Sequence, residues 1–235
     1  MITRNAAILM LFTFTVPLFA GCAVSPVKKF ANQEVHLENS RRLATSRTPI
    51  TWKPRVRHDF SSAKSMEDFT VAHGEWEISD GKLRATGGDT NRVILLARSE
   101  NVPLRIEMDV TNVANADGSL GDITVLINTD NSDGFFSRGY TFTTGSYYNN
   151  CKTLYRSGRP LAKTEYSPVV SGAPNKVVIE VVDGHIRYWL NGMILLEAWD
   201  RDPLVIDPEL WIGIRTWNTL MAVESFAVFE GVKGE

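Results

Sequence analysis

The sequence predicts an all-β fold for residues 59–235, a sandwich or barrel of antiparallel strands. Tight turns are marked by Asp80-Gly81, Asp183-Gly184 and Asn191-Gly192, dipeptides that tolerate positive φ at both centres of a type I′ turn. Runs rich in β-branched and aromatic residues separate turn signals spaced about 8–12 residues apart. No window of about 12 residues in this region sustains the helical period of 3.6.

The clearest expected element is a three-stranded meander over residues 176–196, because two turns divide it into short runs. The strand expected at 104–110 alternates strictly, with apolar residues on one face and Arg105, Glu107 and Asp109 on a solvated face. The other expected elements are a short strand at 58–60, a helical turn at 65–68, a hairpin at 76–85, strands at 92–97, 123–128 and 135–144, a hairpin at 151–166, and strands at 210–217 and 221–230.

Residues 1–22 are predicted to be an export signal and not part of the fold. An apolar run, residues 6–20, follows Arg4 and is shorter than the roughly 20 residues that a membrane span needs. It ends in Ala-Gly before Cys22, which resembles the bacterial lipoprotein signal. The resemblance implies that Cys22 is lipidated, and Ala23 after it implies the outer membrane of the cell envelope. An ordinary cleaved signal with an incidental cysteine is the alternative.

Residues 23–58 are predicted to form a spacer between the anchor and the domain. They carry eight Lys and Arg against two Asp and Glu, and their periodicity is poor. Two interpretations remain open, a segment held against anionic membrane or glycan surfaces and an unbound solvated linker. The last part, residues 49–58, contains Ile50 and Trp52 and could dock on the domain.

The expected domain, residues 59–235, is acidic and long enough for one large core. Sixteen Lys and Arg against 25 Asp and Glu give it a net charge of −9. This sign argues against nucleic acid as a partner, because the phosphate backbone attracts basic surfaces.

The order of the motifs resembles the concanavalin A-like lectin/glucanase superfamily. The resemblance is carried by residues 76–83, by the meander with its Ile-Arg-Tyr-Trp-Leu-Asn-Gly run, and by Gly213-Ile-Arg-Thr-Trp-Asn218. Within the superfamily the chain looks nearest to the YesU-type and 3-keto-disaccharide hydrolase domains. The resemblance covers about residues 59–231. It implies a two-sheet antiparallel jelly-roll sandwich whose concave sheet and rim loops meet carbohydrate.

Glu107 is the candidate catalytic carboxylate. Glycosidases of this superfamily place Glu-x-Asp-x-Glu on one strand, so that period 2 turns all three carboxylates into the cleft, and retaining hydrolysis needs two carboxyls about 5 Å apart. In this sequence Glu107 and Asp109 are present, but Thr111 stands in the third position. A solvated outer face and sugar hydrogen bonding are the alternatives for Glu107, and the incomplete motif favours binding over catalysis.

Two further groups are candidate sugar-binding residues. Tyr148, Asn149 and Asn150 form a polar aromatic stretch after a strand, suited to stacking on sugar C–H faces and bonding hydroxyls; a hairpin loop with Asn in αL geometry is the alternative. The second group is Arg215, Trp217 and Asn218, with Arg138 and Arg156 as additional candidates.

Arg215 and Trp217 are expected to share one strand face with Trp211 and Gly213, opposite Ile212, Ile214 and Thr216. An arginine between two tryptophans, beside a glycine that lets a ligand approach, suits a sugar platform. The alternative is an arginine capped by tryptophan and packed against the protein itself.

No cofactor is predicted, since no P-loop, dinucleotide fingerprint or zinc spacing appears. Residues 128–134 suit either a structural calcium loop or a tight turn, and their spacing misses the EF-hand pattern. Cys151 is expected to be a small buried hydrophobe.

Two functions from different classes remain. The first is a lipid-anchored protein that binds or cleaves glycans; the second is a structural or protein-interaction lipoprotein of the envelope. If Glu107, Asn149, Arg215 and Trp217 converge on one groove, the first is favoured. If their side chains point to different sides, the second is favoured.

Overall fold

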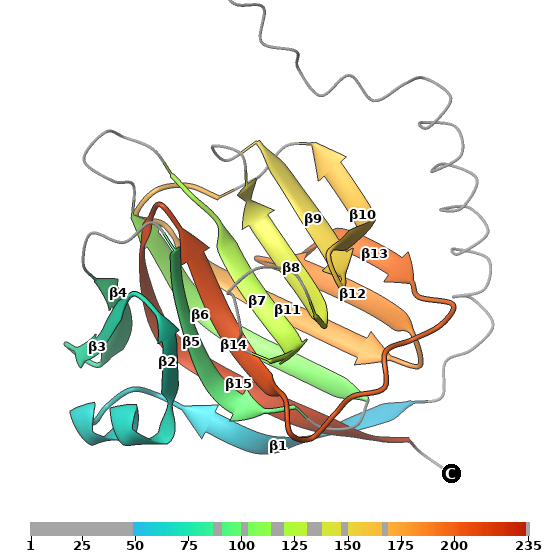
Figure 1. Ribbon diagram of the computed structural model, residues 1–235, viewed down its shortest axis with the longest axis horizontal. Helices are drawn as coiled ribbons and strands as arrows, with labels where there is room; N and C mark the ends of the chain where they lie inside the picture. Colours follow the sequence, from blue (N-terminus) through green and yellow to red (C-terminus); the bar gives the residue numbers. More distant parts are fainter. Residues whose placement is uncertain are drawn as a thin grey trace, which may run out of the picture. The chain divides into compact units, whose positions relative to one another are not determined.

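The protein is a two-layer antiparallel β-sandwich, as the sequence predicts (Figure 1). A computed structural model describes residues 49–86, 91–99, 103–113, 120–130, 138–146, 150–165 and 169–233, which belong to one compact unit, Leu43–Glu235. Sheet A has the strand order β13-β12-β11-β6-β15-β4-β3, with β1 paired to β15, and sheet B has the order β10-β9-β8-β7-β14-β5-β2.

The strands of sheet A come from both ends and the middle of the unit. They are β1 (Ile50–His58), β3 (Glu75–Ser79), β4 (Lys82–Thr86), β6 (Leu104–Val113), β11 (Pro174–Val182), β12 (His185–Leu190), β13 (Met193–Trp199) and β15 (Leu220–Lys233). The strands of sheet B are β2 (Thr70–His73), β5 (Asn91–Arg98), β7 (Ile123–Thr129), β8 (Tyr140–Gly145), β9 (Cys151–Arg156), β10 (Arg159–Glu165) and β14 (Trp211–Trp217).

The predicted hairpins are confirmed. Both residues of Asp80-Gly81, Asp183-Gly184 and Asn191-Gly192 have positive φ, between 49° and 79°, as type I′ turns require. The predicted meander is the β11–β12–β13 run of sheet A.

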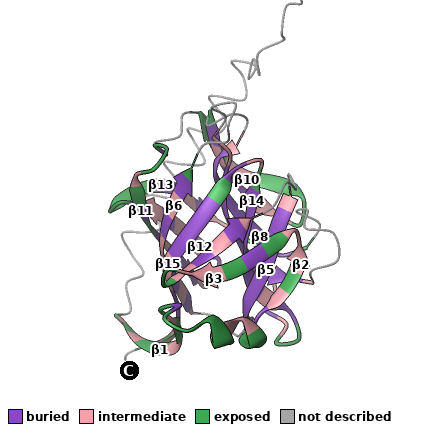
Figure 2. Cartoon of the chain, turned by 90° about the vertical axis from the view of Figure 1, so that its left-hand side faces the viewer, coloured by how far each residue is buried: buried purple, intermediate pink, exposed green. Residues whose placement is uncertain are grey.

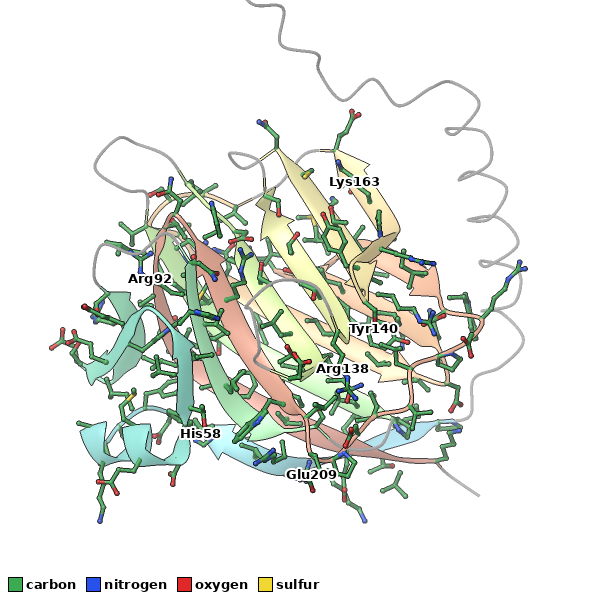
Figure 3. The ribbon with its side chains drawn as sticks, viewed as in Figure 1. His58, Arg92, Arg138, Tyr140, Lys163 and Glu209 are labelled. Carbon is green, nitrogen blue, oxygen red and sulfur yellow. The ribbon has the colours of Figure 1, made fainter. Side chains whose placement is uncertain are left out.

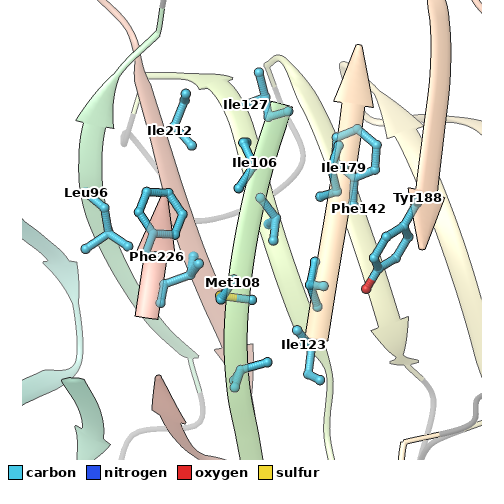
Figure 4. Packing of buried hydrophobic residues seen from close by; sticks show 14 of the residues in the cluster. Leu96, Ile106, Met108, Ile123, Ile127, Phe142, Ile179, Tyr188, Ile212 and Phe226 are labelled. Carbon is cyan, nitrogen blue, oxygen red and sulfur yellow. The ribbon is translucent and has the colours of Figure 1, made fainter. Parts of the chain in front are cut away.

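The core lies between the two sheets and follows the predicted alternation. On β6 the residues Leu104, Ile106, Met108 and Val110 are buried, while the residues between them are partly exposed. Ile106 and Met108 of sheet A and Phe142 of sheet B belong to the same apolar cluster (Figure 4). In sheet B the outward residues of β7 and β8 are buried as well, and β5 is buried over most of its length (Figure 2). Alternation alone does not predict this.

Sheet A begins inside the stretch that the sequence assigns to the spacer. Residues 50–58 form β1 and pair with β15 from Phe226 to Lys233. β1 can pair there because β15 is long. The strand β4 pairs only with residues 221–223 of β15 and leaves the rest of that edge of β15 open. The sequence leaves open whether residues 49–58 dock on the domain. Residues 50–58 do so, by pairing with β15.

The prediction of a short strand at 58–60 is wrong beyond His58, where β1 ends. Phe60 has a φ of 54°, which takes the chain out of the extended conformation, and its side chain is buried against the core. The helical turn expected at 65–68 is a 3₁₀ helix, Ala63–Asp68, whose N-cap Ser62 accepts a hydrogen bond from the Lys64 amide.

The described residues do not reach the N-terminal signal, so the predicted lipidation of Cys22 lies outside them. Within the described part of the chain, none of the helices has the length and apolar character to cross a bilayer. Cys151 is buried and free, as expected.

His58 should make folding stability fall in mild acid. It packs between the rings of Phe60, Phe69 and Phe226, and its buried Nε2 has no hydrogen-bond partner. Burial lowers the pKa of His58 below 6.5, so the folded state binds its proton more weakly than the unfolded state does. Stability is therefore full above pH 6.5 and is lost as the pH falls from 6.5 through the lower folded-state pKa.

Urea denaturation at pH 7.5 and 5.5 tests this, with the His58→Phe variant as the comparison. The wild type should lose stability at the lower pH, and the variant should lose less. Burial also lowers the pKa of His185, so the variant should retain part of the dependence. Equal losses in the two proteins would contradict the assignment to His58.

Candidate functional site

The candidate site lies on the outward face of sheet B, near the end of β14. Ile212, Ile214 and Thr216 of β14 face the core, and Gly213, Arg215 and Trp217 face outward, as the sequence predicts. Arg215 lies between Thr124 of β7 and Val93 of β5 in the strand register. We define the Trp217 cluster as Asn91, Asp122, Thr124, Arg215 and Trp217.

A buried ion pair forms the base of the Trp217 cluster. Arg215 Nη1 lies 3.4 Å from Asp122 Oδ2, and Arg215 Nε donates to Asn91 Oδ1 at 2.8 Å. Arg215 is 3% exposed and Asp122 is 5% exposed. Asp122 also accepts from the Thr124 hydroxyl at 3.0 Å and from the Trp217 amide at 2.7 Å. The pair thus fixes both the guanidinium and the backbone of the tryptophan.

Burial opposes the charge on both members of this pair. It raises the pKa of the Asp122 carboxyl, against the attraction of Arg215 and the donors from Thr124 and Trp217. It lowers the pKa of the Arg215 guanidinium, against the attraction of Asp122. Each charge is stable in this environment only because the other is present.

Trp217 is the most exposed member of the cluster. Its side chain is 39% exposed, and the Arg215 guanidinium lies over its ring, 5.0 Å from the centroid. Gly121 packs so closely against the Trp217 backbone that an added Cβ would lie 1.8 Å from the Trp217 carbonyl oxygen. Asn218 follows with a φ of 49°, a conformation that asparagine tolerates, so this residue has a turn-forming role.

Threonines cover the part of this face over β7, β8 and β9, and a small apolar cluster of Val93, Leu95, Leu126 and Trp211 covers another part. Thr124, Thr143 and Thr153 lie side by side on β7, β8 and β9, in the same cross-strand row as Arg215. The hydroxyls of Thr141 and Thr153 are buried and without a hydrogen-bond partner. All residues of the central strands β9, β8, β7, β14 and β5 are described, and none of their outward side chains is a carboxylate. These strands therefore supply no carboxyl pair of the kind that a retaining glycosidase needs, and the Asp122 carboxylate, which precedes β7, is bound to Arg215.

Glu107 lies on the opposite side of the sandwich, on the outward face of sheet A. Arg105 binds it through Nη2 at 2.6 Å, and Lys176 lies 3.7 Å away. Arg105 also reaches Glu180, which Arg187 binds from the other side, each at 2.5 Å. Glu107 thus belongs to a cross-strand ion-pair ladder, between Lys176 and Arg105. This fits the outer-face interpretation, and it places Glu107 on a different face from Arg215 and Trp217.

Arg138 and Arg156 hold a loop that is remote from the Trp217 cluster. Arg156 Nε lies 2.7 Å from Asp200 Oδ2, to which the Tyr140 hydroxyl also donates at 2.7 Å, and Arg138 pairs with Asp207 at 3.3 Å. In Figure 3, Arg138 and Tyr140 lie far from Arg92, which bonds the β14–β15 turn. Both arginines therefore anchor the connection from β13 to β14.

The remaining candidates are only partly described. Tyr148 and Asn149 lie outside the described residues, and Asn150 is an exposed turn residue whose amide donates to the Ser146 carbonyl. The calcium interpretation falls largely on residues 131–134, also outside. Among the residues that are described, no group of three His, Cys, Asp or Glu could hold a metal ion.

Glu107 does not converge with Arg215 and Trp217, which by the criterion of a single groove favours the structural or protein-interaction alternative. Arg215 and Trp217 lie together, Glu107 points to the other side, and Asn149 is outside the described residues. The sequence interpretation missed Asn91, Asp122 and Thr124, which strand pairing brings to Arg215.

Comparison with solved structures shows the same fold. A Bacillus subtilis protein of unknown function with a galectin-like fold is 16% identical, with a TM-score of 0.61 over 78% of this chain and 100% of that one. A carbohydrate-binding module from B. subtilis is 17% identical, with a TM-score of 0.53 over 67% and 92% of the two chains. An endo-β-1,3-glucanase from Pyrococcus furiosus is 12% identical, with a TM-score of 0.57 over 78% and 96%.

These likenesses show a concanavalin A-like sandwich. No protein-family model matches the chain, and no curated protein matches it in sequence.

Proposed function

We propose that this protein binds carbohydrate at the Trp217 cluster and does so without cleaving it. The observation that carries the proposal is the half-exposed Trp217 ring held over a buried Arg215–Asp122 pair on the outward face of sheet B. Sugar rings stack their C–H faces on aromatic rings, while neighbouring amides and hydroxyls bond the sugar hydroxyls. Asn91 pairs with Trp217 in the strand register and supplies such an amide.

Two observations favour binding over hydrolysis. The outward side chains of the five central strands of sheet B, all of them described, include no carboxylate, and the Asp122 carboxylate that precedes β7 is bound to Arg215. The candidate Glu107 is neutralised in an ion-pair ladder on the other face. The fold is shared with a carbohydrate-binding module as well as with a glucanase, so the fold alone does not decide between the two.

A glycan-array screen of the full-length chain tests the proposal, together with an assay of product release from each glycan that binds. The expected result is binding to at least one glycan class with no new reducing ends. Turnover of a bound glycan would contradict the non-catalytic part. An array on which nothing binds would favour the alternative of a structural or protein-interaction lipoprotein.

We further propose that the chain is anchored in the bacterial envelope through lipid on Cys22, with residues 23–48 as a basic spacer. Full-length protein expressed in a Gram-negative host should incorporate labelled palmitate and sediment with the outer membrane. The Cys22→Ser variant should lose both properties, because no other residue of the signal offers a thiol. The Cys151→Ser variant is the matched control, since this thiol is buried in the fold. Label retained by Cys22→Ser would contradict the anchor.

A further inference from the structure

We infer that the Trp217 cluster selects neutral glycans and discriminates against glycans that carry carboxylates or sulfates. The inference rests on the proposed function and adds the chemical class of the ligand. It follows from how the fold uses the cations near Trp217 and from the charge of the sandwich around them.

Arg215 is directed toward the protein and not toward a ligand. An arginine that reads a carboxylate or sulfate presents its planar fork of N–H donors to the two oxygens. Here Arg215 Nε donates to Asn91 and Nη1 is paired with Asp122, and Arg215 is 3% exposed. The positive charge is therefore balanced inside the fold before any ligand arrives.

Arg92, the neighbouring cation, is directed away from the outward face. Its register partner on β14 is Thr216, which faces the core. Its Nε donates to the Thr86 carbonyl at 2.7 Å, and its Nη1 donates to the Thr219 carbonyl at 3.1 Å. Arg92 is 4% exposed, so it holds the β14–β15 turn and presents no charge to a ligand on Trp217.

The charge of the whole sandwich acts in the same direction. Residues 59–235 carry a net charge of −9, and the three basic residues of β1 leave residues 50–235 at −6. This field repels anionic ligands over a distance of about 10 Å at 0.1 M salt. A neutral sugar that binds by ring stacking and hydrogen bonds meets no such penalty.

The test uses two oligosaccharides of the same length and linkage, taken from the class that the array identifies. One carries a hydroxymethyl group at C6 and the other a carboxylate. With the full-length chain, the acidic ligand should bind at least about tenfold more weakly than the neutral one at low salt. Affinity for the neutral ligand should stay within about twofold between roughly 50 and 500 mM salt.

Asp122→Asn sharpens the test because it removes the negative charge of Asp122 and leaves the positive charge of Arg215 without its counter-ion. The variant should narrow the preference for the neutral ligand by about tenfold, in a salt-dependent manner. Asp80→Asn is the matched control, since its side chain is 86% exposed and its turn position accepts asparagine. The control should keep the wild-type preference.

The outcomes separate this inference from the proposed function. Equal affinity for the two ligands, or tighter and salt-dependent binding of the acidic one by the wild type, would overturn the selectivity while leaving glycan binding in place. Binding of neither ligand would overturn both. The wild-type comparison is decisive by itself if Asp122→Asn does not give a cooperative unfolding transition.

Discussion

Replacing Trp217 with alanine should weaken glycan binding by about thirtyfold, equivalent to about 2 kcal/mol, the range of an aromatic residue that anchors an interface. The ring is the exposed apolar surface of the cluster, while its backbone amide is held by Asp122 at 2.7 Å. Truncation therefore removes the stacking surface and leaves the hydrogen bond that positions the strand end. Isothermal titration with the best glycan from the array measures the loss.

Trp211→Ala is the matched control for this substitution. Trp211 is on the same strand and face, and it too lies against an arginine, Arg98, 3.8 Å from the ring centroid. It begins β14 whereas Trp217 ends it, so the two rings are separated by about 20 Å of strand. Trp211→Ala should bind glycan as the wild type does. An equal loss in the two variants would show that the effect is not local to the Trp217 cluster.

Breaking the Asp122–Arg215 pair from either side should cost about 3–5 kcal/mol of unfolding free energy. Asp122→Asn leaves a buried guanidinium without its counter-ion, and Arg215→Met leaves a buried carboxylate. Both side chains are nearly inaccessible, with side-chain exposures of 4% for Arg215 and 6% for Asp122, so solvent screening offers little compensation. For a domain of this size the loss corresponds to a fall of roughly 10 °C or more in Tm.

The double variant Asp122→Asn/Arg215→Met should be more stable than either single variant. It removes both charges, while the asparagine side-chain oxygen can still accept from the Trp217 amide. Urea denaturation of the four proteins closes a double-mutant cycle, whose coupling energy should be of the order of 3 kcal/mol. Additive losses would mean that the two charges are not coupled and that the cluster is not organised by this pair.

The sequence predicts individual strands and their two faces because both are local properties. Alternation of apolar and charged residues predicts the buried face of β6, and the Asp-Gly and Asn-Gly turns predict the meander. Both signals involve residues within one strand or one hairpin, where side-chain direction has a period of 2.

The composition of the site depends on contacts that local patterns do not contain. Arg215 meets Asn91, which is 124 residues earlier in the chain, and Asp122, which is 93 residues earlier. These contacts follow from the order β7-β14-β5, which places the late strand β14 between two early ones. Glu107 and Arg215 are both outward residues, but only the assignment of their strands to different sheets shows that they face opposite sides.

The most direct test of the sugar site is the response of the six indole N–H signals when ¹⁵N-labelled protein is titrated with a glycan that binds. The chain has six tryptophans, and each signal can be assigned from a single Trp→Phe variant. We expect the Trp217 signal to shift most, with the signals of Trp189 and Trp199 on sheet A unchanged. Shifts confined to Trp189 and Trp199, with Trp217 unaffected, would place the glycan on the opposite face and contradict the proposed site.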